Sequence, residues 1–428
     1  MDAQEQALLE EVRRLQDQQV EWTRQLVAIP TVNPYSGDES AGSEAAGQEW
    51  VEARLQSLGA AVRRIPVPAD VYARGGLIGP AGRSWEGRDN VVAEWVVGSG
   101  AGPTILLNDH MDTVGTAGMR FDPFDPVVED GCMFGRGTSD TKGNLVMGLV
   151  AVQALLVRDR GLAGRLVFES VVDEECNGAG AGTLACCLAG VRGDFALCLD
   201  GDFTHVYNGC NGVVTARVLV RGQSGHGSSR GAISALDKGI EVKQAIDAFA
   251  AEHAEVFPEC PVNIGVFRAG TLPAIVPAET ELQVNLNYDV QDAAHAEEQE
   301  GHWDGRGFRA RFERAMAEMG RHDEWLAREP VQVSWIKDIY PFWCDPQDER
   351  IQVVLQAAAR VRGQPVEAKP LAAWFDAAHL ARQLRVPAVG LAAGTPGTAH
   401  GSGEYVVLEH LFAGAGALAL ALRRLLRA

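Results

Sequence analysis

The segment TILLNDHMD (residues 104–112) joins a short apolar run to acidic and imidazole side chains that follow it directly. The segments RLVFESVVDEE (165–175) and FALCLD (195–200) repeat this arrangement. Apolar runs of this length predict buried strands, and we expect helices between them near 143–158 and 178–190. Strands that alternate with helices favour the α/β class, with a mostly parallel sheet that helices cover on both faces.

The pattern changes after about Gly212, where longer elements replace the regular alternation. Four strands with two helices predict a small α+β unit that resembles a ferredoxin-like sandwich. We therefore expect one domain made of residues 1–212 and 337–428, and a second domain of residues 213–336 inserted into it. The expected strands are 213–222, 262–267, 281–290 and 331–336, the expected helices are about 232–254 and 307–327, and the polar run 291–306 is an expected exposed loop.

The composition restricts the partners of the chain. Its formal net charge is -19, and so acidic a protein repels nucleic acid and anionic lipid, so neither is an expected partner. The first twenty residues lack the basic start and apolar run of a signal peptide, and no apolar stretch approaches the ~18 residues of a membrane span. We expect a cytoplasmic protein whose eight cysteines are free thiols.

Polar side chains with metal-ligating ability follow the predicted strands. In open parallel sheets the carboxyl ends of the strands form the ligand crevice, so these side chains are expected to converge. Imidazole and carboxylate suit zinc, cobalt or manganese, and two ions ~3.5–4 Å apart need a bridging carboxylate. The candidates are His110, Asp140 in GRGTSDTKGN, Glu174 and Glu175, Asp200 with Asp202 beside it, and His400 in GTPGTAHGSGEYV.

The adjacent pair Glu174–Glu175 indicates a division of labour. Neighbouring residues do not easily bind one ion, but one can bind metal while the other accepts the proton of a metal-activated water. Each feature alone has a commonplace explanation, since an HxD motif or a Glu pair usually lies on a solvated surface. Their order on one chain, each beside a strand end or a helix start, favours a site. A phosphate loop at Lys142 is not indicated, because GxxxxGK[ST] is absent.

The chain resembles the aminoacylase, acetylornithine deacetylase and succinyl-diaminopimelate desuccinylase family of co-catalytic zinc metallopeptidases. The segments that carry the resemblance occur in family order over nearly the whole length. They are IPTVNP (29–34), LLNDHMDTV (106–114), GRGTSDTKGN (135–144), VVDEE (171–175), RGQSGHGS (221–228) and GTAHGSGEYV (397–406).

The resemblance implies a role for each candidate residue. His110 and Asp200 would hold one zinc ion, Glu175 and His400 the other, and Asp140 would bridge them. Glu174 would act as general base and then as acid to the leaving nitrogen. Asp112 would fix the tautomer of His110. Asp202 is the alternative to Asp200, because some members carry a ligand in a context similar to Gly201–Thr204.

The resemblance also assigns His226, which falls in the inserted domain. It would reach into an active site, often that of a second subunit, and stabilise the oxyanion, a contribution of ~3 kcal/mol to the barrier reduction. This implies a homodimer formed through the inserted domain, which would also act as a lid that closes over substrate.

Two positions depart from the family pattern. In AGTLPAIVP (269–277), Ala274 occupies the place where relatives have Asn, and the strand ELQVNLN ends in Asn287 where relatives have an Arg that binds a substrate carboxylate. Losing a bidentate cation argues against desuccinylase activity and ordinary α-carboxylate recognition. Arg230 is a possible replacement.

These observations lead to a functional hypothesis. We expect a two-metal amidohydrolase, similar to acetylornithine deacetylase, that acts on a small N-acyl amino acid or related compound. A dipeptidase or carboxypeptidase of the same family is the first alternative. A non-hydrolytic binding protein or an acyl-transferring enzyme is the second, and it is disfavoured because the metal ligands and Glu174 are all present.

Overall fold

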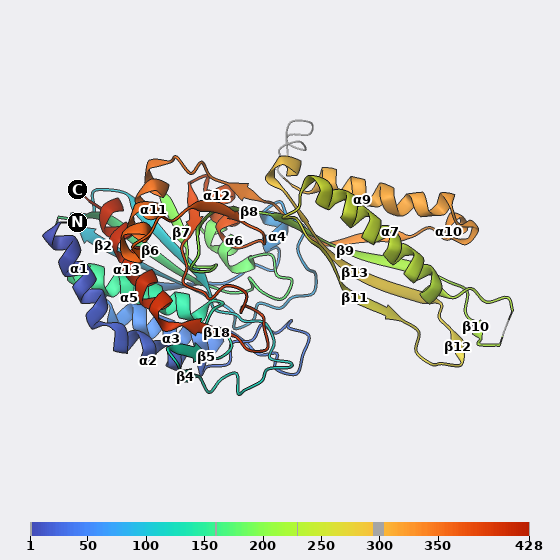
Figure 1. Cartoon of the computed structure of the whole chain (residues 1–428), viewed down its shortest axis with the longest axis horizontal. Coiled ribbons are helices and arrows are strands. Elements are labelled where there is room, and N and C mark those ends of the chain that lie inside the picture. The colour runs from blue at the N-terminus through green and yellow to red at the C-terminus, as the bar shows by residue number, and fades with distance from the viewer. Residues whose placement is uncertain (1, 159–160, 229, 294–303, 428) are drawn as a thin grey trace.

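A computed structural model describes residues 2–158, 161–228, 230–293 and 304–427. Two lobes lie side by side, and the chain passes from the larger lobe into the smaller one and back (Figure 1). The larger lobe contains a nine-stranded sheet in the order β1-β2-β6-β3-β7-β17-β8-β15, with β16 also paired to β8. Its strands are β1 (Ala61–Ile65), β2 (Asn90–Gly98), β3 (Thr104–His110), β6 (Ala163–Val171), β7 (Phe195–Cys198), β8 (Val206–Cys210), β15 (Phe342–Trp343), β16 (Ala368–Leu371) and β17 (Ala388–Gly390).

The centre of this sheet is parallel, as the alternation of strands and helices predicts. Strands β6, β3, β7 and β17 run in one direction. Antiparallel pairings join the flanking strands to this centre: β2 pairs with β6 and β1 with β2 on one side, and β8 pairs with β17 and β15 with β8 on the other. The stretch 99–103 between β2 and β3 is too short for the helical crossover that parallel strands require, so β2 runs opposite to β3.

Helices cover both faces of the sheet, as expected. Alternate residues of one strand enter different cores: Ile105 and Leu107 pack on one face and Leu106 on the other. This alternation follows from the two-residue period of a strand, and burial on both faces explains the continuous apolar runs. One face carries α1 (Ala3–Arg14), α2 (Gln16–Val27), α3 (Ala45–Ser57), α5 (Lys142–Val157), α11 (Glu349–Arg362) and α13 (Leu408–Leu425); the other carries α4 (Val71–Arg74), α6 (Ala181–Leu188) and α12 (Ala377–Leu384).

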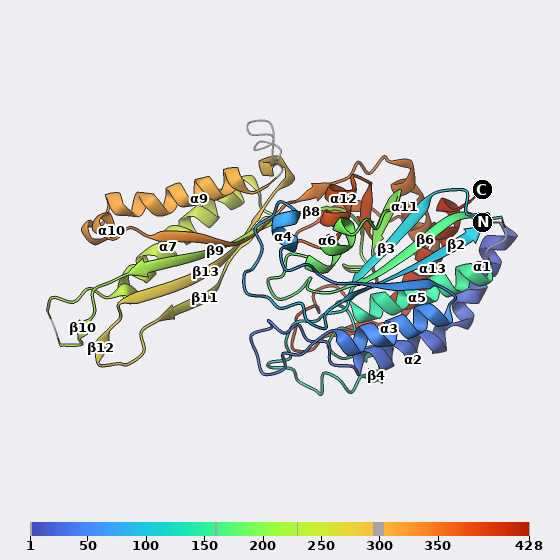
Figure 2. The ribbon, with the colours of Figure 1, turned by 180° about the vertical axis from the view of Figure 1, so that it is seen from behind.

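The smaller lobe has a four-stranded antiparallel sheet in the order β11-β13-β9-β14. Two helices pack on it and share one apolar core with it, and Figure 2 shows this layer from behind. The strand order with its two crossover helices is that of the predicted ferredoxin-like sandwich. The elements are β9 (Gly212–Arg221), α7 (Ala235–Val256), β11 (Val262–Ala269), β13 (Glu279–Tyr288), α9 (Arg306–Glu318) and β14 (Gln332–Ile339).

The structure differs most from the expected elements of this lobe in two places, and the ends of α7, β11 and β13 differ by two or three residues. The helix expected at 307–327 is three pieces: α9, a 3₁₀ turn (Met319–Arg321) and α10 (Glu324–Arg328). The break has a local cause, because the Asp323 side chain accepts a hydrogen bond from the Leu326 N–H and starts a new helix. The strand expected to end at 336 continues to Ile339.

Smaller features complete the fold. A short pair, β10 (Gly225–His226) with β12 (Ile275–Val276), forms the far tip of the smaller lobe (Figure 1). A three-stranded sheet of β4 (Val127–Glu129), β5 (Cys132–Phe134) and β18 (Tyr405–Val407) borders the larger lobe. The eight cysteines are free, as predicted. Within the described ranges no helix is long and apolar enough to cross a membrane. Most of the loop expected at 291–306 lies outside the described residues.

Candidate active site

The side chains that the sequence singles out gather at one edge of the nine-stranded sheet. Because β6, β3, β7 and β17 are parallel, the segments that follow them emerge at the same edge. The residues are His110 at the end of β3, Glu174 and Glu175 after β6, Asp200 after β7, His400 after β17, and Asp140 just before α5.

Asp140 belongs to two groups of candidate metal ligands. One group is His110, Asp140 and Asp200, the other is Asp140, Glu175 and His400, and the ligand atoms within each group lie within 4.8 Å of one another. Asp140 turns one carboxylate oxygen to each imidazole: Oδ1 lies 3.2 Å from His110 Nε2, and Oδ2 lies 3.2 Å from His400 Nε2. A carboxylate placed in this way can bridge two cations.

The electrostatics of the cluster fit a bound cation. Burial, together with the Asp140 carboxylate, raises the pKa of Glu175 to about 7 and that of Asp200 to about 6. The Glu175 carboxylate holds the pKa of His400 at about 12, against the effect of burial. His110 Nε2 is buried and makes no hydrogen bond of good geometry, although Asp140 Oδ1 lies 3.2 Å away. A divalent ion neutralises crowded carboxylates and uses such a nitrogen as a ligand.

Asp112 supports the site differently from the prediction. The backbone carbonyl of Asp112, rather than its carboxylate, lies 2.9 Å from His110 Nδ1, while the carboxylate is 3.6 Å away. A proton held on Nδ1 by that carbonyl leaves Nε2 free as a metal ligand. The Asp112 carboxylate instead accepts hydrogen bonds from the backbone N–H groups of Glu174 at 3.2 Å and Glu175 at 3.1 Å. Asp112 thus connects the histidine to the glutamate pair.

A buried ionic network behind the glutamate pair has no counterpart in the sequence prediction. Arg83 and Arg88 both pair with Asp173, the residue before Glu174. Asn33 donates to Asp112 at 2.8 Å and to Asp173 at 3.2 Å. The only sequence signal for these contacts is the segment IPTVNP, which contains Asn33. Nothing in the local pattern around the two arginines indicates their partner.

Glu174 lines a cavity of about 250 Å³ together with four of the candidate ligands, Asp140, Glu175, Asp200 and His400. Burial raises the pKa of Glu174 well above its ordinary value, with the His110 imidazole opposing this and Glu175 adding to it. Trp374 and Leu371 supply apolar wall. The described lining includes five carboxylates but neither lysine nor arginine: Ser139, Asp140, Glu174, Glu175, Asp200, Gly201, Asp202, Leu371, Ala373, Trp374, Thr395, Pro396, Gly397, Ala399 and His400.

Asp200 and Asp202 have different surroundings. Asp200 belongs to the ligand group with His110 and Asp140. Asp202 instead closes its own turn: its Oδ1 accepts from the Thr204 N–H at 2.8 Å and from the Tyr207 hydroxyl at 2.7 Å. A carboxylate held by such bonds is less available to a metal, so the geometry favours Asp200 as the ligand.

His226 is not part of this cluster. It lies on β10 at the far tip of the smaller lobe, where its Nδ1 is 2.8 Å from the Ser228 hydroxyl (Figure 1). The strand β12 pairs with β10, and the Gly227 N–H donates to the Ala274 carbonyl at 2.8 Å. The structure therefore brings two motif segments of the inserted lobe together, but away from the candidate ligands of the same chain.

Asn287 and Arg230 are also outside the cavity lining. The Asn287 side chain donates to the Pro261 carbonyl at 3.0 Å, which ties β13 to the start of β11. Arg230 is an exposed residue near the tip. Within one chain, neither supplies a cation to the cavity.

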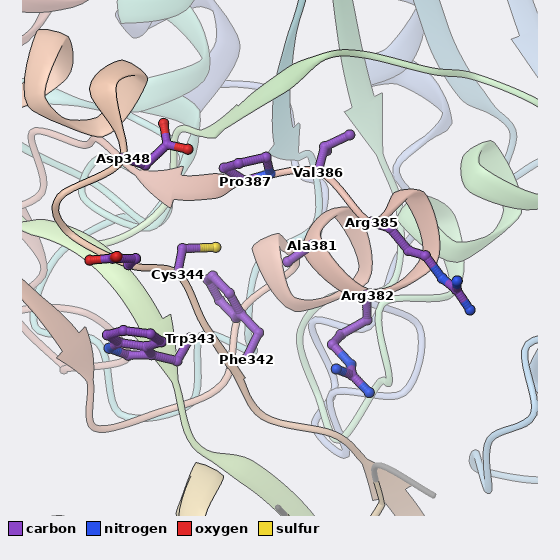
Figure 3. Close-up of a pocket in the computed structure, with 10 residues that line it drawn as sticks. Phe342, Trp343, Cys344, Asp348, Ala381, Arg382, Arg385, Val386 and Pro387 are labelled. Atoms are coloured by element: carbon purple, nitrogen blue, oxygen red, sulfur yellow. The ribbon is translucent and has the colours of Figure 1, made fainter. Parts of the chain in front are cut away.

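A second, larger cavity of about 690 Å³ lies beside β15 and α12 (Figure 3). Phe342, Trp343 and Cys344 form one side, and Val386 and Pro387 form another. It contains none of the candidate metal ligands, so its size does not make it the reactive site.

Two curated relatives are deformylases. An N-formyl-4-amino-5-aminomethyl-2-methylpyrimidine deformylase of Halalkalibacterium halodurans is 24% identical over 436 aligned residues, covering 94% of this chain and 93% of the relative. The enzyme of the same name from Bacillus subtilis is 28% identical over 235 residues, which cover 54% of this chain and 49% of that protein.

Solved structures of dipeptidases share the fold. The dipeptidase Dug1p of Saccharomyces cerevisiae has a TM-score of 0.75 at 14% identity and covers 99% of both chains. Human carnosine dipeptidase 1 has a TM-score of 0.70 at 16% identity, covering 99% of this chain and 100% of that chain.

The sequence model of Peptidase family M20/M25/M40 matches residues 106–424, a range that contains every candidate metal ligand. This match confirms the resemblance carried by the motifs. The chain therefore belongs to peptidase family M20/M25/M40 and is a metal-dependent hydrolase that acts on carbon–nitrogen amide bonds.

Proposed function

We propose that this hydrolase removes a small acyl group from an amine that carries no free carboxylate beside the scissile bond. The observation that carries the proposal is the cavity lining, which has five carboxylates and, among its described residues, no lysine or arginine. Two divalent ions would balance only four of those five negative charges. A substrate carboxylate away from the ions would meet uncompensated negative charge, whereas a neutral or cationic amine would not.

The residues present fit two divalent ions, with zinc preferred and cobalt or manganese as alternatives. His110 and Asp200 would hold one ion, Glu175 and His400 the other, and Asp140 both. When bound, the ions supply Lewis acidity that polarises the scissile carbonyl and makes water a nucleophile at neutral pH.

Glu174 is the proton carrier of the proposal. Its side chain lines the cavity beside the candidate ligands. Among the described residues it forms no ion pair, whereas the Glu175 carboxylate pairs with His400. It would take a proton from the attacking water and return it to the leaving nitrogen. Asp112 would keep Glu174 in place through the N–H bonds described above, and Trp374 would exclude water from the apolar side of the cavity.

The relatives support a deacylase before a peptidase. The deformylase of Halalkalibacterium halodurans aligns over nearly the whole of both chains, and the substrate in its name is an N-formyl amine on a pyrimidine. A formyl or acetyl group suits a cavity of about 250 Å³. An activity similar to that of acetylornithine deacetylase remains an alternative. It is weakened because the described cavity lining has no lysine or arginine to bind the α-carboxylate of such a substrate.

We also propose that the chain acts as a homodimer formed through the inserted lobe. His226 is exposed at the tip and lies away from the ligands of its own chain, so it would meet an oxyanion in the site of a second subunit. The cytoplasmic location stays a prediction.

The experiment uses zinc-, cobalt- or manganese-loaded protein and a substrate pair that differs only in a carboxylate. N-formylbenzylamine and N-formylphenylglycine are such a pair. We expect kcat/KM at least ~10-fold higher for N-formylbenzylamine, equivalent to ~1.4 kcal/mol. A preference for N-formylphenylglycine, or faster hydrolysis of a dipeptide such as Ala-Ala, would overturn the deacylase assignment. Metal binding without turnover of any substrate would favour the non-hydrolytic alternative.

A further inference from the structure

The loop that carries the glutamate pair is attached directly to the base of the inserted sheet. This loop, residues 173–178, follows β6 in the larger lobe. Lys337 on β14 donates from Nζ to the Gly178 carbonyl at 3.0 Å. The hydroxyl of Thr215 on β9 lies 3.0 Å from the side-chain oxygens of both Asn177 in the loop and Asn285 on the neighbouring strand β13. The catalytic loop is therefore joined to the two strands that connect the lobes.

The two strands present these side chains together. Thr215 and Lys337 are cross-strand partners, and paired residues of an antiparallel ladder lie on the same face. The register between β14 and β9 shifts between Trp335 and Lys337, a β-bulge that re-aims the residues after it. Without this irregularity the residue opposite Thr215 would be Ile336, whose side chain has no hydrogen-bond donor.

The loop is compact, so its anchored end determines where Glu174 lies. A side chain at Gly178 would come within 2.3 Å of the Asp173 carbonyl and 2.8 Å of the Glu175 carbonyl. The Gly178 N–H also donates to the Glu175 carbonyl at 2.9 Å. A shift of Gly178 must therefore move the residues on both sides of Glu174.

The junction is also packed as one unit. Ala179, Val213 and Ile339 form a small buried cluster at the junction, and Trp374 of the cavity wall packs against it. Lys337 is only 8% exposed, and the Glu174 carboxylate opposes the effect of burial on its pKa, which lies at about 8. The ammonium is thus buried against the Gly178 carbonyl of the loop rather than exposed to solvent.

We infer that Lys337 and Thr215 are positioning residues that hold the 173–178 loop, and through it Glu174, in register with the base of the inserted domain. The inference rests on the proposed role of Glu174 as proton carrier. It implies that a change in the orientation of the inserted domain changes the placement of that carboxylate, so that closure of the domain and readiness for proton transfer are coupled.

The first test is Lys337→Met, which removes the ammonium and keeps the length of the side chain. We expect kcat to fall roughly 10- to 100-fold, the order that a misplacement of about 1 Å produces, with KM within about threefold of wild type. Bound metal should remain. Because the variant leaves the buried Gly178 carbonyl without its donor, circular dichroism and thermal melting first establish that Lys337→Met is folded. Lys238→Met is the control, since Lys238 pairs with Asp323 and Glu241 elsewhere in the inserted lobe.

The second test removes or keeps the Thr215 hydroxyl. Thr215→Val removes it at nearly constant shape and should lower kcat, while Thr215→Ser keeps it and should restore the rate. If both residues act through one loop, the double variant Lys337→Met/Thr215→Val should lose less than the product of the two single losses. Independent, multiplicative losses would contradict a shared loop.

A readout without substrate separates this inference from the proposed function. Amide hydrogen exchange at 173–178 should accelerate in Lys337→Met and Thr215→Val but not in Lys238→Met. If wild-type protein hydrolyses none of the substrates, the proposed function fails while exchange still reports on the loop. Unchanged exchange and unchanged kcat in folded Lys337→Met and Thr215→Val would overturn the inference. Should Lys337→Met fail to fold, the comparison of Thr215→Val with Thr215→Ser tests the inference instead.

Discussion

The carboxyl edge of the nine-stranded sheet and the β10–β12 tip of the inserted lobe both carry motif residues, but they are assembled differently. At the sheet edge, His110 and His400 both come within ion-pair distance of the Asp140 carboxylate inside a single chain. At the tip, His226 is exposed on a two-residue strand. The parallel strands and the packed core hold the residues of the first region together. Whether His226 of the second region reaches an active site depends on how the lobe or a second subunit is oriented.

The largest expected effect is at the residue that both ligand groups share. Asp140→Asn keeps the shape but removes the charge that faces both imidazoles, so metal content should fall below about one ion per chain and activity should be lost. Metal analysis of dialysed protein measures this. Two ions retained in the variant would show that the two ligand groups do not form one centre.

Next in size is Glu174→Gln. Turnover should fall by roughly 10²- to 10⁴-fold because the amide cannot accept the proton, while the metal content stays at the wild-type value. Steady-state kinetics with metal analysis on the same preparation gives both quantities. Glu129→Gln, on exposed β4, is the control. Substantial activity in Glu174→Gln would falsify the assigned role.

The tip can be tested by complementation. His226→Ala alone should lower kcat roughly 100-fold, the loss expected for one oxyanion donor. If His226 acts in a second subunit, mixing His226→Ala with Glu174→Gln under exchange conditions should recover about a quarter of wild-type activity, since half the dimers then hold one complete site. His322→Ala, exposed in the same lobe, should have no effect. No recovery, in subunits shown to exchange, would exclude the arrangement in trans.

A smaller effect on metal affinity or activity is expected at Asp112, which lies behind the metal ligands. Asp112→Asn disturbs the carboxylate that receives the N–H groups of Glu174 and Glu175, so metal affinity or activity should drop roughly 10- to 100-fold. Titration of the metal-free protein with zinc measures the affinity. Wild-type affinity together with wild-type kcat would show that these bonds are dispensable.

The smallest expected effect is on metal binding, and it distinguishes Asp200 from Asp202. Asp202→Asn should leave the metal content unchanged, because Asp202 closes its own turn, whereas Asp200→Asn should weaken one ion by the ~10-fold or more expected of a lost interaction with the metal. The reverse result would make Asp202 the ligand.

Much of the catalytic edge could be predicted because strand ends are local features. The run TILLNDH shows both that a buried strand exists and that His110 ends it, and the same holds for Glu174 after β6. The buried partners Arg83 and Arg88 could not be predicted, because nothing local shows that they meet Asp173, some 85 to 90 residues away. The dual contact of Asp112 was missed for a related reason: the sequence names the residue but not which of its oxygens is used.

The sequence alone determined the α/β class, the ferredoxin-like insertion and the set of residues that can bind metal, because these follow from hydrophobic period, strand-end position and donor chemistry. The tertiary structure decided that Arg83 and Arg88 meet Asp173, and that Lys337 is attached to the 173–178 loop. These depend on register, on a single bulge and on contacts between distant segments. Their energies are set by packing in three dimensions, which no local pattern records.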